Sequence, residues 1–309
     1  MSRPSVQAPA AIVMVRPHHF SVNTETAQDN AFQASHGDAD SALLARRAYD
    51  EHSAAVAELE RHGVRVHVFE GEDPATPDCV FPNNWFSTHA GGHVAIYPMK
   101  AMNRRRERRS DIIEMLKARY RVQDVIDYSG LEPDGLFLEG TGAMVLDHIE
   151  RIAYAVASER TNPIALERFC THFGFEPMVF PATDSRSKPI YHTNVLMCIG
   201  TDFALIGDGM ITDRARREEV VARLEESGRV VIRLNEAQIG AFAGNAIELQ
   251  GRDARLLALS RTAFDALTES QREMIAESAT LVPLSIPTLE MAGGSVRCTM
   301  AGIHLAPRR

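Results

Sequence analysis

Five stretches of the chain carry apolar residues at the spacing of an amphipathic helix. The first, which includes Leu43 and Leu59, stops before Gly63, because glycine suits the left-handed position that follows a helix. Another begins with Asn162 as its cap and Pro163 in its first turn, where the missing N–H of proline costs nothing. The expected helices cover residues 41–62, 106–120, 162–174, 213–227 and 253–276.

Short segments between these helices have the pattern of strands. Residues 64–69 alternate with the period of two that a half-buried strand requires. The expected strands cover residues 64–69, 93–99, 142–146, 152–157, 195–199, 203–206 and 229–234. Strands and helices alternate along the whole chain, which predicts an α/β fold. A repeat of about sixty residues fits this alternation, but the self-similarity is too weak to establish one.

The composition is that of a soluble globular protein, with 45% apolar and 24% charged residues among 309. No low-complexity tract or shift in composition divides the sequence, so we expect one domain over residues 1–309, with residues 1–10 flexible. No apolar run approaches the roughly eighteen residues of a membrane-spanning helix, and the first residues lack a signal-peptide pattern. The net charge of −8 argues against nucleic acid, which requires a basic face. We therefore expect a cytoplasmic protein that binds neither membranes nor nucleic acid; a homodimer is compatible with the sequence.

The four cysteines are Cys79, Cys170, Cys198 and Cys298. They form no C-x-x-C pair, so a zinc ribbon or a thioredoxin-like site is not expected, and a few free thiols suit a reducing cytoplasm. Cys298 differs from the others because paired glycines at 293–294 stand just before it. Glycine has no Cβ, so such a pair lets the backbone approach a ligand. Cys298 is therefore the candidate nucleophile.

A thiol is a weak nucleophile until it loses its proton, so Cys298 needs a base or a positive neighbour. Arg297 is adjacent in the sequence, but neighbours along a strand point to opposite faces. The best candidate base is His192, which enters the apolar strand at 195–199. Taken alone, a histidine in this position is either a satisfied core residue or a site residue.

One acidic residue stands in apolar surroundings. Glu139 follows Leu138 and precedes Gly140 and Gly142, and a buried carboxylate is costly unless it is paired or hydrogen-bonded. Glu139 is either a surface residue of a turn or a carboxylate placed to meet a cation.

Two further groups of polar residues are candidates for ligand binding. Asp78, Asn83 and Asn84 stand beside the only tryptophan, and amides in a half-buried setting need partners. Arg160 and the arginine run at 104–106 offer donors for a carboxylate ligand. A run of arginines is also typical of a solvated helix start, and paired asparagines are typical of a turn.

Taken together, these segments resemble the pentein, or guanidino-group-modifying, superfamily. The similarity is greatest to the dimethylarginine dimethylaminohydrolase and amidinotransferase-like branch, in particular to its citrulline-utilisation hydrolases, and it extends from Arg16 to Leu305. No single motif is specific, but six occur in the order of the family. They are the substrate-gripping loop Pro77–Phe81, the basic segment Asn103–Glu107, the acid-glycine turn Leu138–Gly140, the arginine-threonine-asparagine step at Ser158–Asn162, His192 and Cys298.

The resemblance implies a fold and a reaction class. The fold is a pentein α/β propeller of five ββαβ-type modules with pseudo-fivefold symmetry around a central channel, which holds the site. In the family mechanism, the thiolate of Cys298 attacks the central carbon of a guanidino or ureido group. His192 protonates the departing nitrogen and then activates water. Glu139 holds the histidine or the cationic group, and no metal or organic cofactor is required.

The resemblance also implies how a small-molecule amino-acid substrate is held. Asp78 grips the substrate, while Arg104 and Arg160 bind its α-carboxylate. The chain departs from the guanidinium-specific pattern in three positions. It has Asn83 and Asn84 where relatives place acids, and Asn194 follows the histidine where deiminases often carry aspartate.

These three amides change the expected substrate. A guanidinium is cationic and offers only donors, so carboxylates suit it, whereas a neutral ureido group also presents a carbonyl acceptor. An amide can both accept from the ureido N–H groups and donate to the ureido oxygen. A carboxylate facing that oxygen would cost about 1–3 kcal/mol or more. The sequence therefore favours citrulline, converted to ornithine, ammonia and carbon dioxide.

Other functions stay open at this point. Within the hydrolases, arginine dihydrolase or deiminase activity and dimethylarginine hydrolysis are alternatives to citrulline hydrolysis. An amidinotransferase would pass the amidino group to an amine instead of water. A binding protein without activity would be expected to have lost the thiol or the histidine, and this chain has both. A papain-like protease carries its cysteine near the mature N-terminus, which does not match Cys298.

Overall fold

The computed structural model describes residues 5–26, 30, 32–33 and 41–308, and its strands form five sheets of three strands each. In every sheet the middle strand pairs antiparallel with one neighbour and parallel with the other. The sheets contain β15 (Ala301–Gly302), β1 (Ala11–Pro17) and β2 (Arg65–Gly71); β3 (Phe86–His89), β4 (His93–Ile96) and β5 (Asp124–Asp127); and β6 (Met144–Asp147), β7 (Ile152–Val156) and β8 (Glu176–Phe180). The other two contain β9 (Met197–Ile199), β10 (Phe203–Ile206) and β11 (Val230–Arg233); and β12 (Ile247–Gln250), β13 (Arg255–Ser260) and β14 (Thr280–Leu284).

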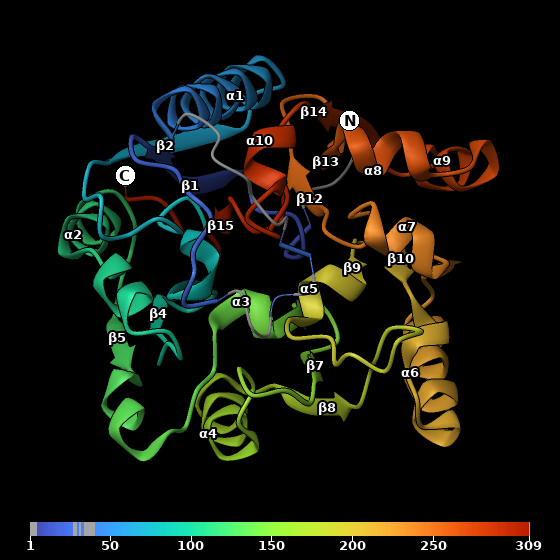
Figure 1. Cartoon of the computed structure of the whole chain (residues 1–309). Coiled ribbons are helices and arrows are strands. Elements are labelled where there is room, and N and C mark those ends of the chain that lie inside the picture. The colour runs from blue at the N-terminus through green and yellow to red at the C-terminus, as the bar shows by residue number, and fades with distance from the viewer. Residues whose placement is uncertain (1–4, 27–29, 31, 34–40, 309) are drawn as a thin grey trace.

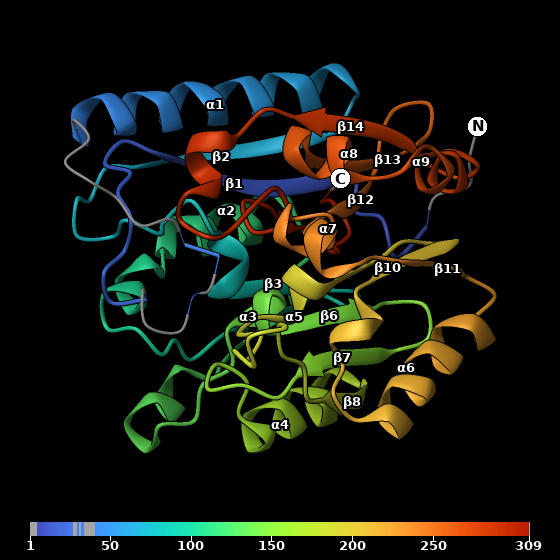
Figure 2. The ribbon, with the colours of Figure 1, turned by 45° about the vertical axis from the view of Figure 1, so that its right-hand side comes forward.

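Each parallel pair is joined by a helical crossover, because parallel neighbours cannot be linked by a tight hairpin. The crossovers are α1 (Ser41–Arg61), α2 (Ser110–Arg119), α4 (Pro163–Phe173), α6 (Arg214–Glu226), and the pair α8 (Arg261–Ala266) and α9 (Glu269–Ala276). The chain therefore consists of five ββαβ units, as the resemblance implied. Figures 1 and 2 show the crossover helices on the outside and the sheets inside them. Shorter helices are η1 (Pro82–Asn84), η2 (Asn103–Glu107), η3 (Ser129–Asp134), α3 (Gly140–Ala143), α5 (Thr193–Leu196), η4 (Asp208–Met210), α7 (Glu236–Gly240) and α10 (Pro287–Glu290).

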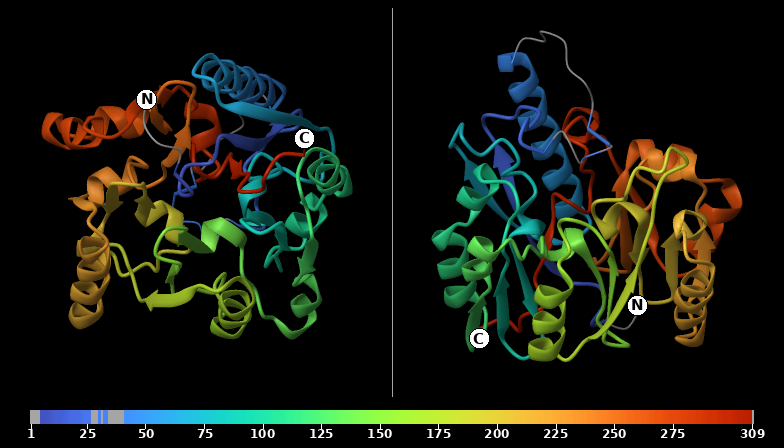
Figure 3. Two further views of the ribbon diagram at one scale, coloured as in Figure 1. Left: turned by 180° about the vertical axis from the view of Figure 1, so that it is seen from behind. Right: turned by 60° about the horizontal axis from the view of Figure 1, so that its bottom comes forward.

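One of the sheets is built from both ends of the chain. Strand β15 pairs antiparallel with β1, so that Gly302 lies opposite Ile12 and Ala301 lies opposite Val13. The C-terminal segment, drawn in red, consequently lies beside the N-terminal unit, drawn in blue (Figures 1 and 3). In both figures the five units follow one another around the middle of the molecule.

The first strand of each unit lines an interior cavity, which we call the channel cavity. Its volume is about 50 Å³. Its lining includes residues of β3, β6, β9, β12 and β15, namely Phe86, Ser87, Thr88, Val145, Leu146, Met197, Cys198, Ile199, Ile247, Glu248, Ala301 and Gly302. Since all five sheets contribute, the channel cavity lies where the units meet.

A short helix or turn precedes each of these five strands, and it is these turns that position the polar residues of the site. They are η1 before β3, α3 before β6, α5 before β9, residues 243–246 before β12, and residues 295–300 before β15. In α3 the backbone of Gly140 has a φ of +47°, a conformation that glycine adopts at little cost. A Cβ there would also lie 2.4 Å from the carbonyl oxygen of Asn83, so glycine is required for this turn to pack against η1.

Most of the predicted helices are confirmed. Helix α1 begins at Ser41 and ends before Gly63, whose φ is +88°. The side chain of Asn162 caps α4 by accepting a hydrogen bond from the N–H of Ile164. The helix expected from residue 106 begins instead at Ser110, because residues 103–107 form the 3₁₀ turn η2.

The prediction of a single helical region over residues 253–276 is wrong in its first part. Residues 255–260 form β13, and α8 begins only at Arg261. Strand β13 is the middle strand of its sheet and is buried on both faces. A strand of this kind reads as a continuous apolar run, which periodicity alone cannot separate from a buried helix. The strand expected at 195–199 likewise begins at Met197, since residues 193–196 form α5.

The sequence predicts no membrane-spanning helix and a flexible segment at residues 1–10. None of the described helices is long and apolar enough to cross a membrane. Of the segment expected to be flexible, residues 1–4 lie outside the described residues. Within the rest of it, Gln7 is buried and its side chain donates to the carbonyl oxygens of Leu146 and Ile199, both at 3.0 Å.

Candidate active site

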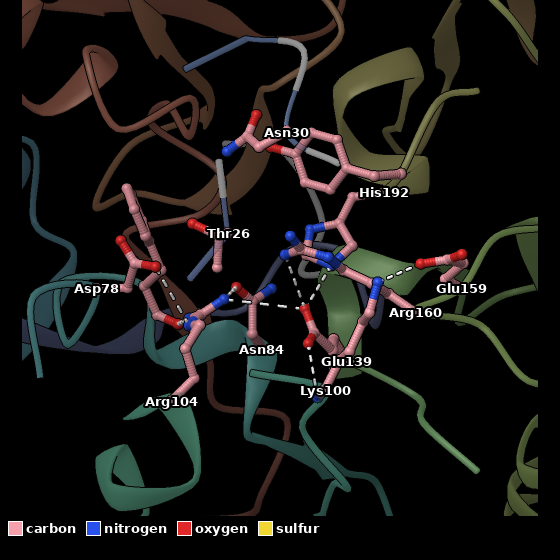
Figure 4. A network of polar contacts seen from close by, with 12 residues as sticks. Thr26, Asn30, Asp78, Asn84, Lys100, Arg104, Glu139, Glu159, Arg160 and His192 are labelled. Carbon is pink, nitrogen blue, oxygen red and sulfur yellow. Dashed lines mark hydrogen bonds and ion pairs between the residues drawn. The ribbon is translucent and has the colours of Figure 1, made fainter. Parts of the chain in front are cut away.

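Cys298 and His192 line one cavity, which we call the site cavity. Its volume is about 20 Å³. The segments that form it come from distant parts of the sequence, and Figure 4 shows several of their polar side chains pointing toward one another. The lining residues are Thr26, Asn30, Asp78, Phe81, Asn84, Arg104, Arg160, Tyr191, His192, Ala292, Gly294 and Cys298.

His192 is held by Glu139. Its Nε2 lies 2.9 Å from Oε2 of Glu139, and both side chains are buried. Burial lowers the pKa of His192 from its ordinary value, although the hydrogen bond to Glu139 opposes this shift. The imidazole is therefore neutral at pH 7, with its proton on Nε2 facing the carboxylate. This leaves Nδ1 as the acceptor, which is the form that a general base requires.

Glu139 is the carboxylate that meets cations, as one of the two sequence interpretations anticipated. Its Oε2 lies 3.3 Å from Nη1 of Arg160 and 3.9 Å from Nη1 of Arg104, and its Oε1 accepts from the backbone N–H of Lys100 at 3.0 Å. Burial would raise the pKa of Glu139, but Arg160, His192 and Arg104 together hold that pKa below its ordinary value. Glu139 is consequently ionised and fixes the orientation of His192.

The sulfur of Cys298 accepts two hydrogen bonds. The Nδ2 groups of Asn194 and Asn245 each lie 3.2 Å from Sγ, and Asn245 also donates to the backbone carbonyl of Asn194 at 3.0 Å. Because that carbonyl can only accept, the orientation of the Asn245 amide is fixed. Two N–H donors directed at one sulfur stabilise negative charge on it.

Asn245 was missed by the sequence reasoning. It stands in the turn at residues 243–246, between small residues and the first residue of β12. Its position relative to the next strand is the signal that could have identified it. Like Asn84, Asn194 and Cys298, Asn245 stands within three residues of the start of the strand that follows its turn. The sixty-residue repeat is too weak in the sequence to show that these four residues occupy equivalent positions before the strands are known.

Glycines allow these side chains to approach one another. A Cβ at Gly142 would lie 2.2 Å from Nδ2 of Asn84 and 2.9 Å from Nδ1 of His192. A Cβ at Gly294 would lie 3.2 Å from Cβ of Cys298. Glycine at position 294 therefore leaves room for the side chain of Cys298; the approach of this backbone to a ligand stays a prediction.

Arg104 is enclosed by partners within the protein. Its Nε and Nη2 donate hydrogen bonds to the two carboxylate oxygens of Glu107, both at 2.9 Å. Its Nη1 donates to Oδ1 of Asn84 at 2.9 Å. The nearest oxygen of Asp78 lies 3.6 Å from Nε. Burial would lower the pKa of Arg104, but Glu107 and Asp78 raise it above its ordinary value. The guanidinium therefore orients Asn84 and leaves few donors for a ligand, which differs from the carboxylate-binding role that the resemblance implied.

Of the other residues predicted for substrate binding, Asp78 and Arg160 line the site cavity and Asn83 does not. Asp78 lines the site cavity, where Asn23 donates to its Oδ2 at 2.7 Å and its Oδ1 has no partner among the described residues. Arg160 lines it as well, with its guanidinium 4.9 Å from the ring centre of Tyr191. Asn83 is fully buried but does not line the site cavity, so Asn84 is the member of the pair that faces this cavity.

The contacts of Asn245 lead to a first prediction. Asn245→Ala removes one of the two donors to Sγ, and a hydrogen bond to a charged group is worth about 1.5–3 kcal/mol. We expect iodoacetamide to alkylate Cys298 about 10- to 100-fold more slowly at pH 7 in this variant. Tryptic mass mapping of the alkylated peptide over time measures the rate. Asn235→Ala, which removes a capping amide at the start of α7 that does not line the site cavity, is the control. An unchanged rate in Asn245→Ala would contradict the assigned contact.

Among the described residues, no group of three or more His, Cys, Asp or Glu side chains is arranged to hold a metal ion.

The comparisons with known proteins fit this geometry. The sequence matches the family described as N,N dimethylarginine dimethylhydrolase, eukaryotic, over residues 16–305. No curated protein matches the chain significantly. The N-terminal domain of ArgZ, an arginine dihydrolase from the ornithine-ammonia cycle in cyanobacteria, superposes with a TM-score of 0.72 at 17% identity, covering 95% of this chain and 97% of that one.

Two further solved structures are similar. AgrE, solved with L-arginine, has a TM-score of 0.73 at 17% identity, and the match covers 96% of this chain but 40% of AgrE. The dimethylarginine hydrolase DDAH from Pseudomonas aeruginosa, solved with citrulline, has a TM-score of 0.63 at 14% identity, covering 96% of this chain and 99% of that one. At such low identities these likenesses establish a shared fold.

Proposed function

Since the chain belongs to the N,N dimethylarginine dimethylhydrolase family of the pentein superfamily, we propose that it is a cysteine-dependent hydrolase that converts citrulline to ornithine, ammonia and carbon dioxide. The proposal includes a closed five-module propeller formed by residues 1–309 as one domain. The cytoplasmic location and a homodimer stay predictions from the sequence.

The orientation of the Asn84 amide carries the choice of a ureido substrate. Its Oδ1 accepts a hydrogen bond from Nη1 of Arg104. The flipped amide would place Nδ2 against Nη1, and an arginine has no atom that could accept from it. The Nδ2 of Asn84 is therefore a buried donor without a partner among the described residues. A ureido oxygen can accept from this donor, whereas a guanidinium has only donors to present to it.

The first half of the proposed reaction forms a covalent intermediate. Neutral His192 accepts the thiol proton of Cys298, and the thiolate adds to the ureido carbon while the ureido oxygen accepts from Asn84. The protonated His192 then delivers its proton to the departing amino group, which leaves as ammonia. The product of this half is a thiocarbamate that joins Sγ to the side-chain nitrogen of ornithine.

The second half hydrolyses that intermediate. His192 takes a proton from water, whose oxygen attacks the thiocarbamate carbon, and the C–S bond breaks with return of the proton to the sulfur. The released carbamic acid of ornithine loses carbon dioxide to give ornithine. One citrulline and one water thus yield one ornithine, one ammonia and one carbon dioxide.

The other end of the substrate is assigned to two residues. Arg160 would bind the α-carboxylate, and the unpartnered Oδ1 of Asp78 would accept from the α-ammonium group. Burial raises the pKa of Asp78, but Arg104 and Asn23 oppose the shift, and an ammonium partner would favour the ionised form further. Arg104 has a positioning role through Asn84 in this account.

Arginine dihydrolysis is the second candidate, and one comparison favours it. The ArgZ domain is an arginine dihydrolase, and with one asparagine replaced by serine it holds a covalently bound reaction intermediate. Dihydrolysis of arginine would proceed through a citrulline-like species, so the two activities can share the second half of the reaction described above.

A substrate panel separates these functions and supplies a second prediction. We expect the wild-type chain to release ornithine and ammonia from citrulline, and to turn over dimethylarginine poorly. In Asn84→Asp a carboxylate replaces the free donor, so citrulline turnover should fall about 10- to 100-fold, equivalent to the 1–3 kcal/mol cost of an unsatisfied buried group. The ratio of arginine to citrulline turnover should rise at the same time.

The control for this experiment is Asn235→Asp, because aspartate caps α7 as well as asparagine does. It should leave both rates unchanged. If the wild-type chain consumes dimethylarginine while citrulline stays inert, the ureido assignment is wrong.

A further inference from the structure

Tyr191 stands next to His192 in the sequence and lines the site cavity, yet the proposed reaction gives it no role. Its side chain is buried, and a buried phenol hydroxyl is costly unless it finds a hydrogen-bond partner. The partner of this hydroxyl lies in the segment that carries the proposed nucleophile.

The hydroxyl of Tyr191 donates a hydrogen bond to the backbone carbonyl of Gly293 at 2.8 Å. Gly293 belongs to residues 291–300, which join α10 to β15 and contain Cys298. It has a φ of +81° and is followed by Gly294, and glycine leaves a backbone freer than any other residue does. The hydrogen bond therefore restrains the segment where its own side chains restrain it least.

Further hydrogen bonds connect Gly293 to the thiol. The N–H of Gly293 donates to the carbonyl of Glu290 at 2.9 Å, and the hydroxyl of Ser295 donates to Oε1 of Glu290 at 2.7 Å. The N–H of Cys298 in turn donates to the carbonyl of Ser295 at 3.0 Å. Because these residues are bonded to one another, a shift of the backbone at Gly293 also moves Sγ of Cys298.

The rest of Tyr191 contacts the other side of the site. Its ring centre lies 4.6 Å from the ring centre of His192, and the guanidinium of Arg160 lies 4.9 Å from the same ring. Its backbone carbonyl accepts from the hydroxyl of Ser158 at 2.8 Å. Tyr191 thus joins the segment that carries the thiol to the residues that carry the base and the guanidinium.

The hydroxyl is suited to holding the backbone and not to proton transfer. Burial raises the pKa of Tyr191 above its ordinary value, so the phenol keeps its proton at pH 7. That proton is directed at the carbonyl of Gly293, which leaves it unavailable to a departing group.

We propose that Tyr191 is a positioning residue, whose hydroxyl sets the place of Cys298 relative to His192 by holding Gly293. A nucleophile and its base must be aligned closely, since a misplacement of about 1 Å can cost about 10²-fold in rate. The proposal rests on the cysteine and histidine mechanism of the proposed function, but not on the choice of citrulline as the substrate.

Tyr191→Phe removes the hydroxyl and keeps the ring. With the substrate that the wild-type chain turns over fastest, we expect kcat to fall about 10-fold or more. KM should stay within about twofold of wild type, because the ring still packs against Arg160. Tyr154→Phe is the matched control: Tyr154 is a fully buried residue of β7 whose hydroxyl has no partner among the described residues and which does not line the site cavity. It should leave kcat and KM unchanged.

Alkylation of Cys298 by iodoacetamide as a function of pH gives a second reading that needs no substrate. The thiolate is the reactive form, and in the proposed reaction it forms by proton transfer to His192. A displaced thiol should therefore react with a higher pH midpoint in Tyr191→Phe than in wild type or Tyr154→Phe. If the wild-type chain turns over no substrate of the panel, the proposed function is wrong, and the alkylation midpoint still decides the role of Tyr191.

Thermal unfolding of the same variants separates positioning from stability. A Tyr191→Phe variant whose Tm falls while kcat and the alkylation midpoint stay at their wild-type values would overturn the proposal, because the hydroxyl would then serve stability alone. Equal losses of kcat in Tyr191→Phe and Tyr154→Phe would overturn it as well.

Discussion

Cys298→Ser and His192→Ala are each expected to reduce citrulline hydrolysis by at least about 10³-fold, as removal of a nucleophile or a base does in other covalent hydrolases. The serine hydroxyl is a far weaker nucleophile than a thiolate that receives hydrogen bonds from Asn194 and Asn245. In the proposed reaction His192 is both the base for the thiol and the acid for the departing nitrogen, so its removal affects both steps. Ornithine and ammonia release, measured together on the purified variants, gives both losses.

Folding controls keep this result interpretable. Cys170→Ala removes a buried thiol in the core beneath α4, away from the site cavity, and should retain activity. Circular dichroism and the Tm of Cys298→Ser should stay close to wild type, because serine differs from cysteine by one atom. A variant lacking either Cys298 or His192 that still works at a near-native rate would remove that residue from the mechanism.

Glu139→Gln is the second change with a large expected effect, and it should act on both activity and stability. The variant breaks the buried ion pair between Glu139 and Arg160, and breaking a buried ion pair typically costs about 3–5 kcal/mol. It also replaces by an NH₂ donor one of the two oxygens that accept from His192 and from the N–H of Lys100. We expect a loss of activity of about 10²-fold or more, in line with the loss of a group that orients a catalytic base.

The stability cost should depend on pH in a defined direction. The pKa of Glu139 is held below its ordinary value of 4.5, so the charged form stabilises the folded state at pH values above 4.5 and this stabilisation is lost as the pH falls below it. The difference in unfolding free energy between wild type and Glu139→Gln should therefore shrink on acidification. Urea unfolding at several pH values measures it.

The matched control is Glu159→Gln, which removes a largely exposed carboxylate paired with Lys100. Exposed ion pairs contribute about 0–1 kcal/mol, so its unfolding should change little. A Glu139→Gln variant as stable and as active as Glu159→Gln would show that Glu139 does not organise the site.

The sequence was sufficient to predict the residues that carry strong chemical signatures. Cys298, beside Gly293 and Gly294, and His192, which enters an apolar segment, both line the site cavity. Glu139, the acid between apolar residues and glycines, contacts His192. Each of these is a local anomaly, a polar group where the surrounding pattern is apolar. Such anomalies can be read without knowing the fold.

Bonding partners could not be read in the same way. The resemblance predicts that Arg104 binds a substrate carboxylate. In the structure its Nε and Nη2 donate instead to Glu107, because both residues lie in η2 and both side chains are buried. Asn245 has no distinguishing signature in the sequence, and it is the fold that brings it to Cys298. The difference between free and occupied donors depends on tertiary contacts, which a single sequence does not specify.

The fivefold arrangement was also beyond the local pattern. Strand β13 is buried on both faces and was mistaken for helix, while β15 has only two residues and owes its existence to pairing with β1. Neither has a periodicity that could identify it. The expectation of five ββαβ units came from the family resemblance alone, and the five sheets confirm those units.

The most direct test of the account is to quench the wild-type enzyme with acid during turnover of citrulline labelled with ¹³C in its ureido group. We predict a thiocarbamate on the peptide that contains Cys298, with a mass that shifts with the label, and labelled carbon dioxide among the products. The central claim is that this thiol attacks the ureido carbon. It would be contradicted if labelled citrulline were consumed without any label on that peptide, or if the label were found attached to a different residue.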